Sequence, residues 1–144
     1  MVFSNILVGV DGSESSKKAL QKAIDLAKAL NATLHIVSVV KPIELAAIDY
    51  IPPEDIEEYE HEQIEKIKPC LNEAKKLAEE NGLKPNVKIL EGDPAEELMD
   101  YADDNNCDLI VVGYRGKGGF KRLLLGSTAN NLVKYANQSV LVVK

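Results

Sequence analysis

Four segments of the chain are rich in consecutive apolar residues, and a fifth alternates between apolar and polar positions. Apolar runs of this length are typical of strands that are buried on both faces of a sheet. The alternation in the fifth segment instead predicts a short strand at a sheet edge. In chain order, the predicted strands cover residues 2–10, 32–40, 86–90, 108–112 and 139–144.

Between these segments, apolar residues recur every three or four positions, which predicts helices. The first runs over residues 13–30, a long one over 56–78, a third begins at an Asp93 cap, and the last spans 129–136. Pro69 lies inside the long pattern. Because a proline removes one backbone hydrogen bond, we expect a kink or a break in the helix there.

Strands and helices alternate along the whole sequence. This order predicts a parallel sheet that is covered by helices on both faces and joined by right-handed crossovers. The 144 residues fit one domain, 1–144, with a substantial core, and they contain no internal repeat or low-complexity segment.

The segment 113–127 follows a predicted strand and leads into a predicted helix. It carries four glycines within seven residues and four cations from Arg115 to Arg122. Glycines let the backbone approach a ligand closely, and Gly126 with Ser127 can present unpaired N–H groups at a helix start. The segment is neither a P-loop nor a dinucleotide fingerprint, yet its composition predicts a site for phosphate groups.

The position of this segment indicates what else shares the site. In open parallel sheets, ligands lie beyond the carboxyl ends of the strands, where the strand order reverses. Residues 9–13 end the first strand and residues 113–119 follow the fourth, and these are the two most polar and glycine-rich turns of the chain. We therefore expect them to flank one shared site.

Charge and hydropathy narrow the classes of partner. A formal net charge of −6 argues against a general nucleic-acid binder, whose contact face would be basic. It does not exclude an anionic nucleotide, because a Debye length of about 8 Å lets the local cations outweigh remote acids. No apolar run approaches the roughly 20 residues of a membrane span, and the N-terminus lacks a basic flank, so we expect no membrane association and a cytoplasmic location.

Other residues with potential chemistry carry less weight. Cys70 and Cys107 have no CxxC partner, and we expect neither a disulfide nor a metal cluster. His35 sits in an apolar run and is interpreted as a hydrogen-bonded core residue rather than a ligand. The acidic residues between 54 and 65 are interpreted as a solvated helix face, with a partner or metal surface as the alternative.

The spacing of the glycines resembles that of a known family. Gly113, two residues, Gly116, nine residues and then Gly126 with Ser127 is similar to the pattern of the ATP-binding members of the universal stress protein family. The turn 10–13 also resembles the family, and the resemblance covers essentially the whole chain. It implies a Rossmann-like, open five-stranded sheet in the order 3-2-1-4-5 and usually a homodimer.

The resemblance also implies an adenine nucleotide, ATP, with Mg²⁺ or Mn²⁺ as an ion that could accompany it. It places Asp11 near the ribose or the metal, the backbone of Val39 at the adenine, and the glycine segment at the phosphates. The implied binding residues are Gly9, Val10, Asp11, Val39, Val112, Gly113, Arg115, Gly116, Gly126, Ser127 and Thr128.

Some of these residues also have structural interpretations. Asp11 could instead cap the first helix, and Ser127 is expected to cap the last helix even if its hydroxyl also donates to a phosphate. The C-terminal strand is too apolar for a free sheet edge, so we predict a symmetric homodimer through residues 139–144.

Taken with the resemblance, these features predict an ATP-binding regulator of stress response that acts on an unknown protein partner. Hydrolysis is left open: Asp11 is the one evident base near the loop, which allows slow turnover at most. One alternative is a phosphoryl- or adenylyl-transferring enzyme on the same fold. Another is an interaction module without nucleotide, against which the glycines argue because we see no packing purpose for them.

Overall fold

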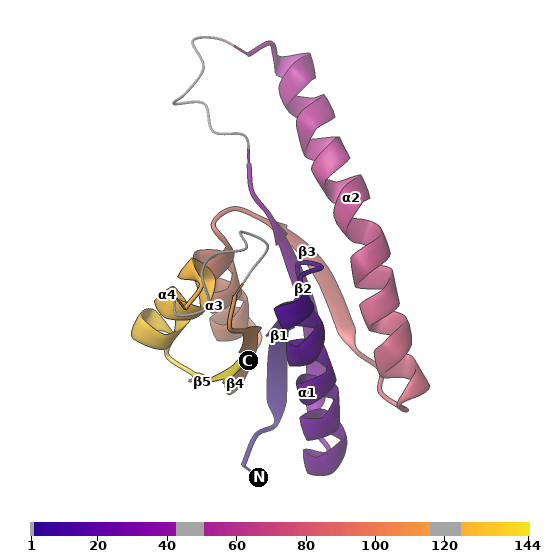
Figure 1. Cartoon of the computed structure of the whole chain (residues 1–144), viewed down its shortest axis with the longest axis vertical. Helices are drawn as coiled ribbons and strands as arrows, with labels where there is room; N and C mark the ends of the chain where they lie inside the picture. The colour runs from indigo at the N-terminus through magenta and orange to yellow at the C-terminus, as the bar shows by residue number, and fades with distance from the viewer. Residues whose placement is uncertain (1, 43–50, 116–124) are drawn as a thin grey trace.

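The computed structural model describes residues 2–42, 51–115 and 125–144, and its strands and helices alternate from the first to the last (Figure 1). The elements are β1 (Asn5–Gly9), α1 (Glu14–Leu30), β2 (Thr33–Val40), α2 (Pro53–Glu80), β3 (Asn86–Glu91), α3 (Pro94–Asp104), β4 (Leu109–Gly113), α4 (Ser127–Tyr135) and β5 (Ser139–Val143).

The five strands form one parallel sheet in the order β3-β2-β1-β4-β5. The chain moves outward from β1 to β2 and β3, and then crosses to β4 on the other side of β1. The strand order therefore reverses between β1 and β4, as the sequence predicted. β3 and β5 are the two edge strands.

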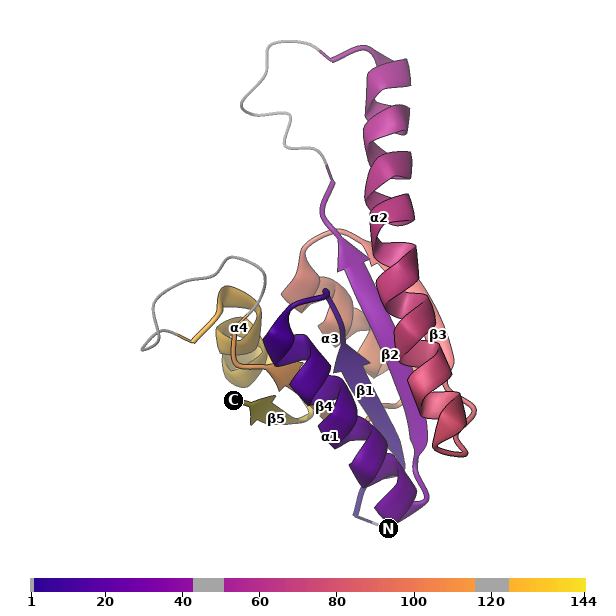
Figure 2. The ribbon, with the colours of Figure 1, turned by 45° about the vertical axis from the view of Figure 1, so that its right-hand side comes forward.

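Two hydrophobic cores lie on opposite faces of the sheet. The first packs α1 and α2 against Ile6 and Val8 of β1, and the second packs α3 and α4 against Leu7 of the same strand. This arrangement follows from the two-residue period of a strand, which sends neighbouring side chains to opposite faces. Figures 1 and 2 show the resulting layers of helix, sheet and helix.

Helix α2 is continuous over 28 residues, so a break at Pro69 is wrong, while a kink there stays a prediction. Pro69 and Glu65, whose carbonyl loses its partner, are both exposed, and water can therefore satisfy that carbonyl. The buried residues that attach the helix to the sheet, Leu71, Ala74 and Ala78, all follow the proline.

The first half of α2 extends past the carboxyl ends of the strands, as Figures 1 and 2 show. Most of its acidic residues are exposed, which agrees with the interpretation as a solvated face. Glu60 is half-buried, and the nearby carboxylate of Glu91 raises its pKa. In the described ranges, no group of three or more His, Cys, Asp or Glu could hold a metal ion.

The amino ends of the strands are closed by hydrogen bonds. His35 is buried, and its ring contacts the Tyr101 hydroxyl through Nδ1 at 2.8 Å and Asn5 Oδ1 through Nε2 at 3.2 Å. Burial lowers its pKa. Asp108 accepts from the backbone N–H groups of Ser4 and Asn5 at 2.8 and 3.0 Å. The interpretation of His35 as a hydrogen-bonded core residue is confirmed.

Cys70 and Cys107 are not joined in a disulfide. Cys107 is buried, and burial raises its pKa to about 11, so its thiol is protonated at neutral pH. None of the described helices combines the length and the hydrophobicity that a membrane span requires.

Candidate functional site

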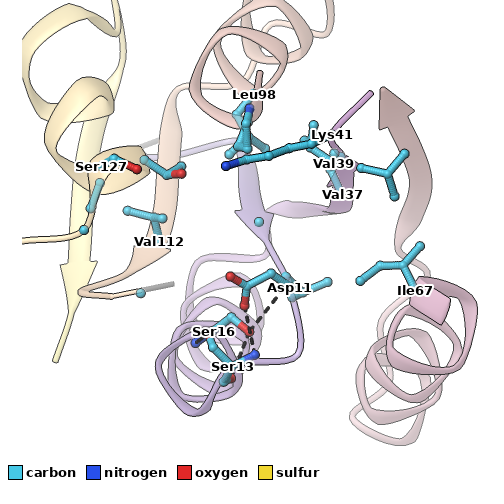
Figure 3. A pocket seen from close by; sticks show the side chains of 18 of the residues that line it. Asp11, Ser13, Ser16, Val37, Val39, Lys41, Ile67, Leu98, Val112 and Ser127 are labelled. Atoms are coloured by element: carbon cyan, nitrogen blue, oxygen red, sulfur yellow. Dashed lines mark hydrogen bonds between the residues drawn. The ribbon is translucent and has the colours of Figure 1, made fainter. Parts of the chain in front are cut away.

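A cleft of about 650 Å³ lies at the carboxyl ends of β1, β2 and β4, between the start of α4 and the side of α2 (Figure 3). All the predicted site residues that the structure describes line this cleft; Gly116 lies outside the described residues. They are Gly9, Val10, Asp11, Val39, Val112, Gly113, Arg115, Gly126, Ser127 and Thr128.

Asp11 leads a tight turn into α1. Gly12 adopts φ 86°, a value that favours glycine, and this brings the Ser13 N–H within 2.9 Å of Asp11 Oδ1. The helix cap is Ser13, whose Oγ accepts from the Ser16 N–H at 3.1 Å. The alternative that Asp11 caps α1 is therefore wrong, and its carboxylate orders the turn while lining the cleft.

Two buried hydroxyls hold the same turn from either side. Ser16 Oγ donates to the Ser13 carbonyl at 3.0 Å and accepts from the Asp11 N–H at 3.3 Å. On β2, Ser38 Oγ donates to the Val10 carbonyl at 2.8 Å. The backbone on both sides of Asp11 is thus fixed to α1 and to β2.

Gly113 has a packing purpose that the sequence did not reveal. A Cβ at this position would lie 2.7 Å from the backbone carbon of Ser15 and 2.7 Å from its Cβ. The glycine therefore lets β4 approach the first turn of α1 closely. At Gly9 the contact is milder, since a Cβ would meet Leu98 Cδ1 at 3.1 Å. The expectation that the glycines have no purpose in packing is wrong for Gly113.

Backbone hydrogen bonds close the base of the glycine segment. The Tyr114 N–H donates to the Val143 carbonyl at 2.8 Å, and the Gly126 N–H donates to the Tyr114 carbonyl at 2.9 Å. The described residues on the two sides of 116–124 are thus joined at Tyr114 and Gly126, beside the end of β5. The N–H of Gly126 is consequently paired rather than available to a ligand.

The start of α4 differs from the expectation in one residue. Gly126 is the N-cap and makes no side-chain cap, while Ser127 is the first helical residue, so the predicted capping by Ser127 is wrong. The first intrahelical bond runs from the Asn130 N–H to the Gly126 carbonyl. The helical amides before it, those of Ser127, Thr128 and Ala129, therefore have no partner within the helix.

Sequence reasoning missed the wall that α2 contributes. Tyr59, Gln63 and Ile67 recur every four residues on one side of the helix, and together with Lys66 they line the cleft. Lys41, just after β2, lines it as well. The spacing is visible in the sequence but resembles ordinary packing on a sheet. No local pattern shows that the first half of α2 passes beyond the carboxyl ends of the strands.

The lining changes in character from one end of the cleft to the other. Figure 3 shows Ser127 and Val112 on one side of Asp11, and Ile67 on the opposite side. Strands β2 and β4 flank β1, so about 10 Å separates them. The α4 end offers helix N–H groups and Arg115 to an anion, and the middle offers a carboxylate. The β2 end combines apolar side chains with those of Lys41 and Lys66.

The sheet with its reversal point and the cleft above it define a Rossmann-like α/β protein. The chain belongs to the universal stress protein family, whose family model matches residues 3–144. Universal stress protein MJ0531 of Methanocaldococcus jannaschii is 38% identical over 144 residues, which cover 99% of this chain and 83% of that protein.

Solved structures are similar over the full length. Protein MJ0577 of the same organism has a TM-score of 0.87 at 30% identity, with 100% of this chain and 97% of that chain covered. A universal stress protein in complex with cAMP has a TM-score of 0.76 at 29% identity, with 100% and 99% of the two chains covered.

Proposed function

We propose that this protein binds ATP in the cleft at the carboxyl ends of β1 and β4 and acts in the cytoplasm as a nucleotide-dependent regulator of stress response. The observation that carries the proposal is convergence: residues from β1, β2, β4 and α4, far apart in sequence, line one cleft. The similarity to a universal stress protein in complex with cAMP supports an adenine nucleotide as the ligand.

The gradient along the cleft suggests one orientation for the nucleotide. Phosphates fit the α4 end, where the amides of Ser127 and Thr128 begin a helix and Arg115 adds positive charge. The ribose then lies over β1 beside Asp11. The adenine lies above β2, between Val39 and the apolar side chains of α2 that line the cleft.

The same orientation accommodates a divalent ion. Protein sites for Mg²⁺ commonly supply one or two carboxylates and leave the other positions to phosphates and water. Asp11 would supply such a carboxylate to Mg²⁺ or Mn²⁺, and the ion would neutralise phosphate charge. Asp11 Oδ1 accepts from Ser13, and Oδ2 has no such role in the turn.

The lining favours a regulator over an efficient enzyme. Among the described residues that line the cleft, Asp11 is the only carboxylate, and there is no histidine or cysteine. Asp11 also orders its own turn, so it is poorly suited to carry a proton in each cycle. We therefore propose slow ATP hydrolysis at most, with the bound nucleotide acting as a signal to a protein partner.

The edge strand β5 supports a homodimer as part of the proposal. Val140, Leu141, Val142 and Val143 are only partly buried in the single chain, and the edge leaves backbone groups unpaired. Pairing with a second copy would cover these side chains and would pair the backbone groups of the edge. Light scattering at micromolar concentration should give the mass of two chains, and the mass of one chain would contradict the dimer.

Calorimetry with ATP tests the nucleotide proposal directly. We expect saturable binding with one ATP for each chain, and an adenine nucleotide in protein denatured directly after purification. Mass spectrometry of the released ligand identifies that nucleotide. The absence of both binding heat and a co-purified nucleotide would contradict the proposal. Many phosphate-releasing turnovers per second would instead favour an enzyme.

A further inference from the structure

We propose that Ser16 is a positioning residue, which sets Asp11 for contact with the ribose hydroxyls of the nucleotide. This inference rests on the proposed function and assigns a role to a residue that no sequence motif indicated. Ser16 lies in the first turn of α1 and lines the cleft, yet it is only 5% exposed. A hydroxyl so buried is poorly placed to bind the ligand itself.

Both hydrogen bonds of the Ser16 hydroxyl hold the Asp11 turn. Its Oγ accepts from the Asp11 N–H at 3.3 Å and donates to the Ser13 carbonyl at 3.0 Å. Ser13 in turn donates from its N–H to Asp11 Oδ1 at 2.9 Å. Figure 3 shows these three residues joined in a closed ring.

The ring acts on both parts of Asp11. Ser16 fixes the backbone N–H of Asp11, and it also holds the carbonyl of Ser13, the residue whose N–H donates to Oδ1. One carboxylate oxygen is thereby held by the protein, which leaves Oδ2 to contact a ligand. A carboxylate held in one orientation loses less conformational entropy when it accepts hydroxyl hydrogen bonds, so binding is tighter.

Capping of α1 does not explain this side chain. The cap is the Ser13 Oγ, which accepts from the backbone N–H of Ser16 and not from its hydroxyl. Ser16→Ala therefore keeps the cap and removes only the two hydrogen bonds that the Ser16 hydroxyl makes with the turn. If Ser16 has a purely structural role, Ser16→Ala changes stability alone. If Ser16 positions Asp11, the loss of affinity depends on which groups of the nucleotide Asp11 contacts.

Calorimetry with two nucleotides separates these roles. ATP carries both ribose hydroxyls, and 2′,3′-dideoxy-ATP carries neither. We expect Ser16→Ala to weaken ATP binding by about three- to tenfold, the range of one net hydrogen bond, and to leave dideoxy-ATP binding unchanged. In an Asp11→Ala background, Ser16→Ala should add no further loss of ATP affinity.

Three variants serve as controls. Ser16→Thr keeps the hydroxyl and should restore ATP affinity, and Ser16→Cys keeps the size with a weak hydrogen-bonding group should Ser16→Ala fail to fold. Asp93→Ala removes the cap of α3, where Asp93 Oδ2 accepts from the Glu96 N–H at 3.1 Å, and Asp93 lies outside the cleft lining. It should lower the melting temperature without changing ATP affinity.

The outcomes distinguish the positioning role of Ser16 from the proposed ATP binding on which it rests. If the unmodified protein binds ATP and Asp11→Ala weakens that binding, but Ser16→Ala and Ser16→Cys do not, the positioning role is overturned. Equal losses for ATP and dideoxy-ATP would overturn it too, because they indicate general damage to the cleft. Absence of ATP binding by the unmodified protein would instead contradict the proposed function and the inference with it.

Discussion

The two ends of the sheet both carry polar side chains, but they use them differently. At the amino ends, His35 pairs with Tyr101 and Asn5, and Asp108 pairs with the backbone of Ser4 and Asn5. These groups satisfy one another within the protein. Such closure is what buried polar groups need, and it leaves nothing for a ligand to bind.

At the carboxyl ends, the polar groups are held in place, but some of their hydrogen-bonding atoms keep no partner within the described protein. Asp11 is ordered through one oxygen, and the amides of Ser127 and Thr128 start a helix beside a cleft of about 650 Å³. The difference teaches that a polar residue at a strand end indicates a site only when its neighbours orient it and still leave atoms facing the cleft. The following variants test this contrast.

The largest effect is expected at the closed end. Asp108→Ala removes the acceptor of two backbone N–H groups and should lower the free energy of unfolding by about 2–4 kcal/mol. ATP affinity should not change, because Asp108 lies at the end opposite to the cleft. Urea unfolding and calorimetry measure the two quantities, and Asp108→Asn, which keeps one acceptor oxygen, should lose about half as much stability. A loss of ATP affinity in folded Asp108→Ala would break the contrast.

At the cleft end, Gly113→Ala should cost about 1–3 kcal/mol of unfolding free energy, because the new Cβ meets the backbone of Ser15. The matched variant is Gly9→Ala, whose Cβ meets the end of the flexible Leu98 side chain and should cost less. Thermal unfolding of both variants checks the order. Equal losses of stability would contradict this order, because they would mean that the Ser15 backbone accommodates a Cβ as easily as the Leu98 side chain does.

Asp11→Ala should act on the ligand more than on the fold. We expect ATP binding to weaken by at least several-fold, and up to about tenfold, or about 1.4 kcal/mol, since a charged acceptor for ribose hydroxyls or a metal is lost. The free energy of unfolding should fall less, because the Ser13 cap of α1 remains. An unchanged dissociation constant would reduce Asp11 to an element of its turn.

The smallest effect is a pH dependence of stability at the closed end. Burial places the folded-state pKa of His35 below its ordinary value of 6.5. The imidazole is neutral in both states above that pH, and below it the unfolded chain binds the proton first, so stability falls as the pH drops until the folded pKa is reached. We expect less than about 1 kcal/mol of loss between pH 7 and pH 5.5.

His35→Gln isolates this contribution. The variant should lose the part of the pH dependence that belongs to His35, and the carboxylates keep their own. Urea unfolding at both pH values measures the difference between the two proteins. A stability that rises on acidification in the unmodified protein but not in His35→Gln would mean that the folded state favours the charged ring, and that the amino end is not closed.

Much of the fold could be predicted because it follows from local patterns. The near-continuous apolar run that ends at Val112 specified a strand buried on both faces, and the spacing from Ala19 to Leu30 specified α1. The spacing of Gly113, Gly116 and Gly126 indicated the family, and through it the strand order. Each of these signals lies within a short stretch of chain, where neighbouring residues decide the outcome.

Other features depended on distances between segments, which no local pattern contains. Pro69 predicted a kink or a break, but α2 continues through it, since the proline is solvent-exposed and the sheet holds the helix beyond it. Tyr59 and Ile67 belong to the apolar pattern that predicted the helix, and only the course of α2 placed them, together with Gln63, on the cleft.

The sequence by itself thus determined the alternation of strands and helices, the two turns that flank the site and the residue types within them. Only the tertiary structure decided how those turns are held. It brought β4 against Ser15, which gives Gly113 its packing purpose, and it closed the ring of Ser16, Ser13 and Asp11. The physical reason is that periodicity and spacing act along the chain, whereas steric contact and hydrogen-bond geometry are set only when separate segments meet.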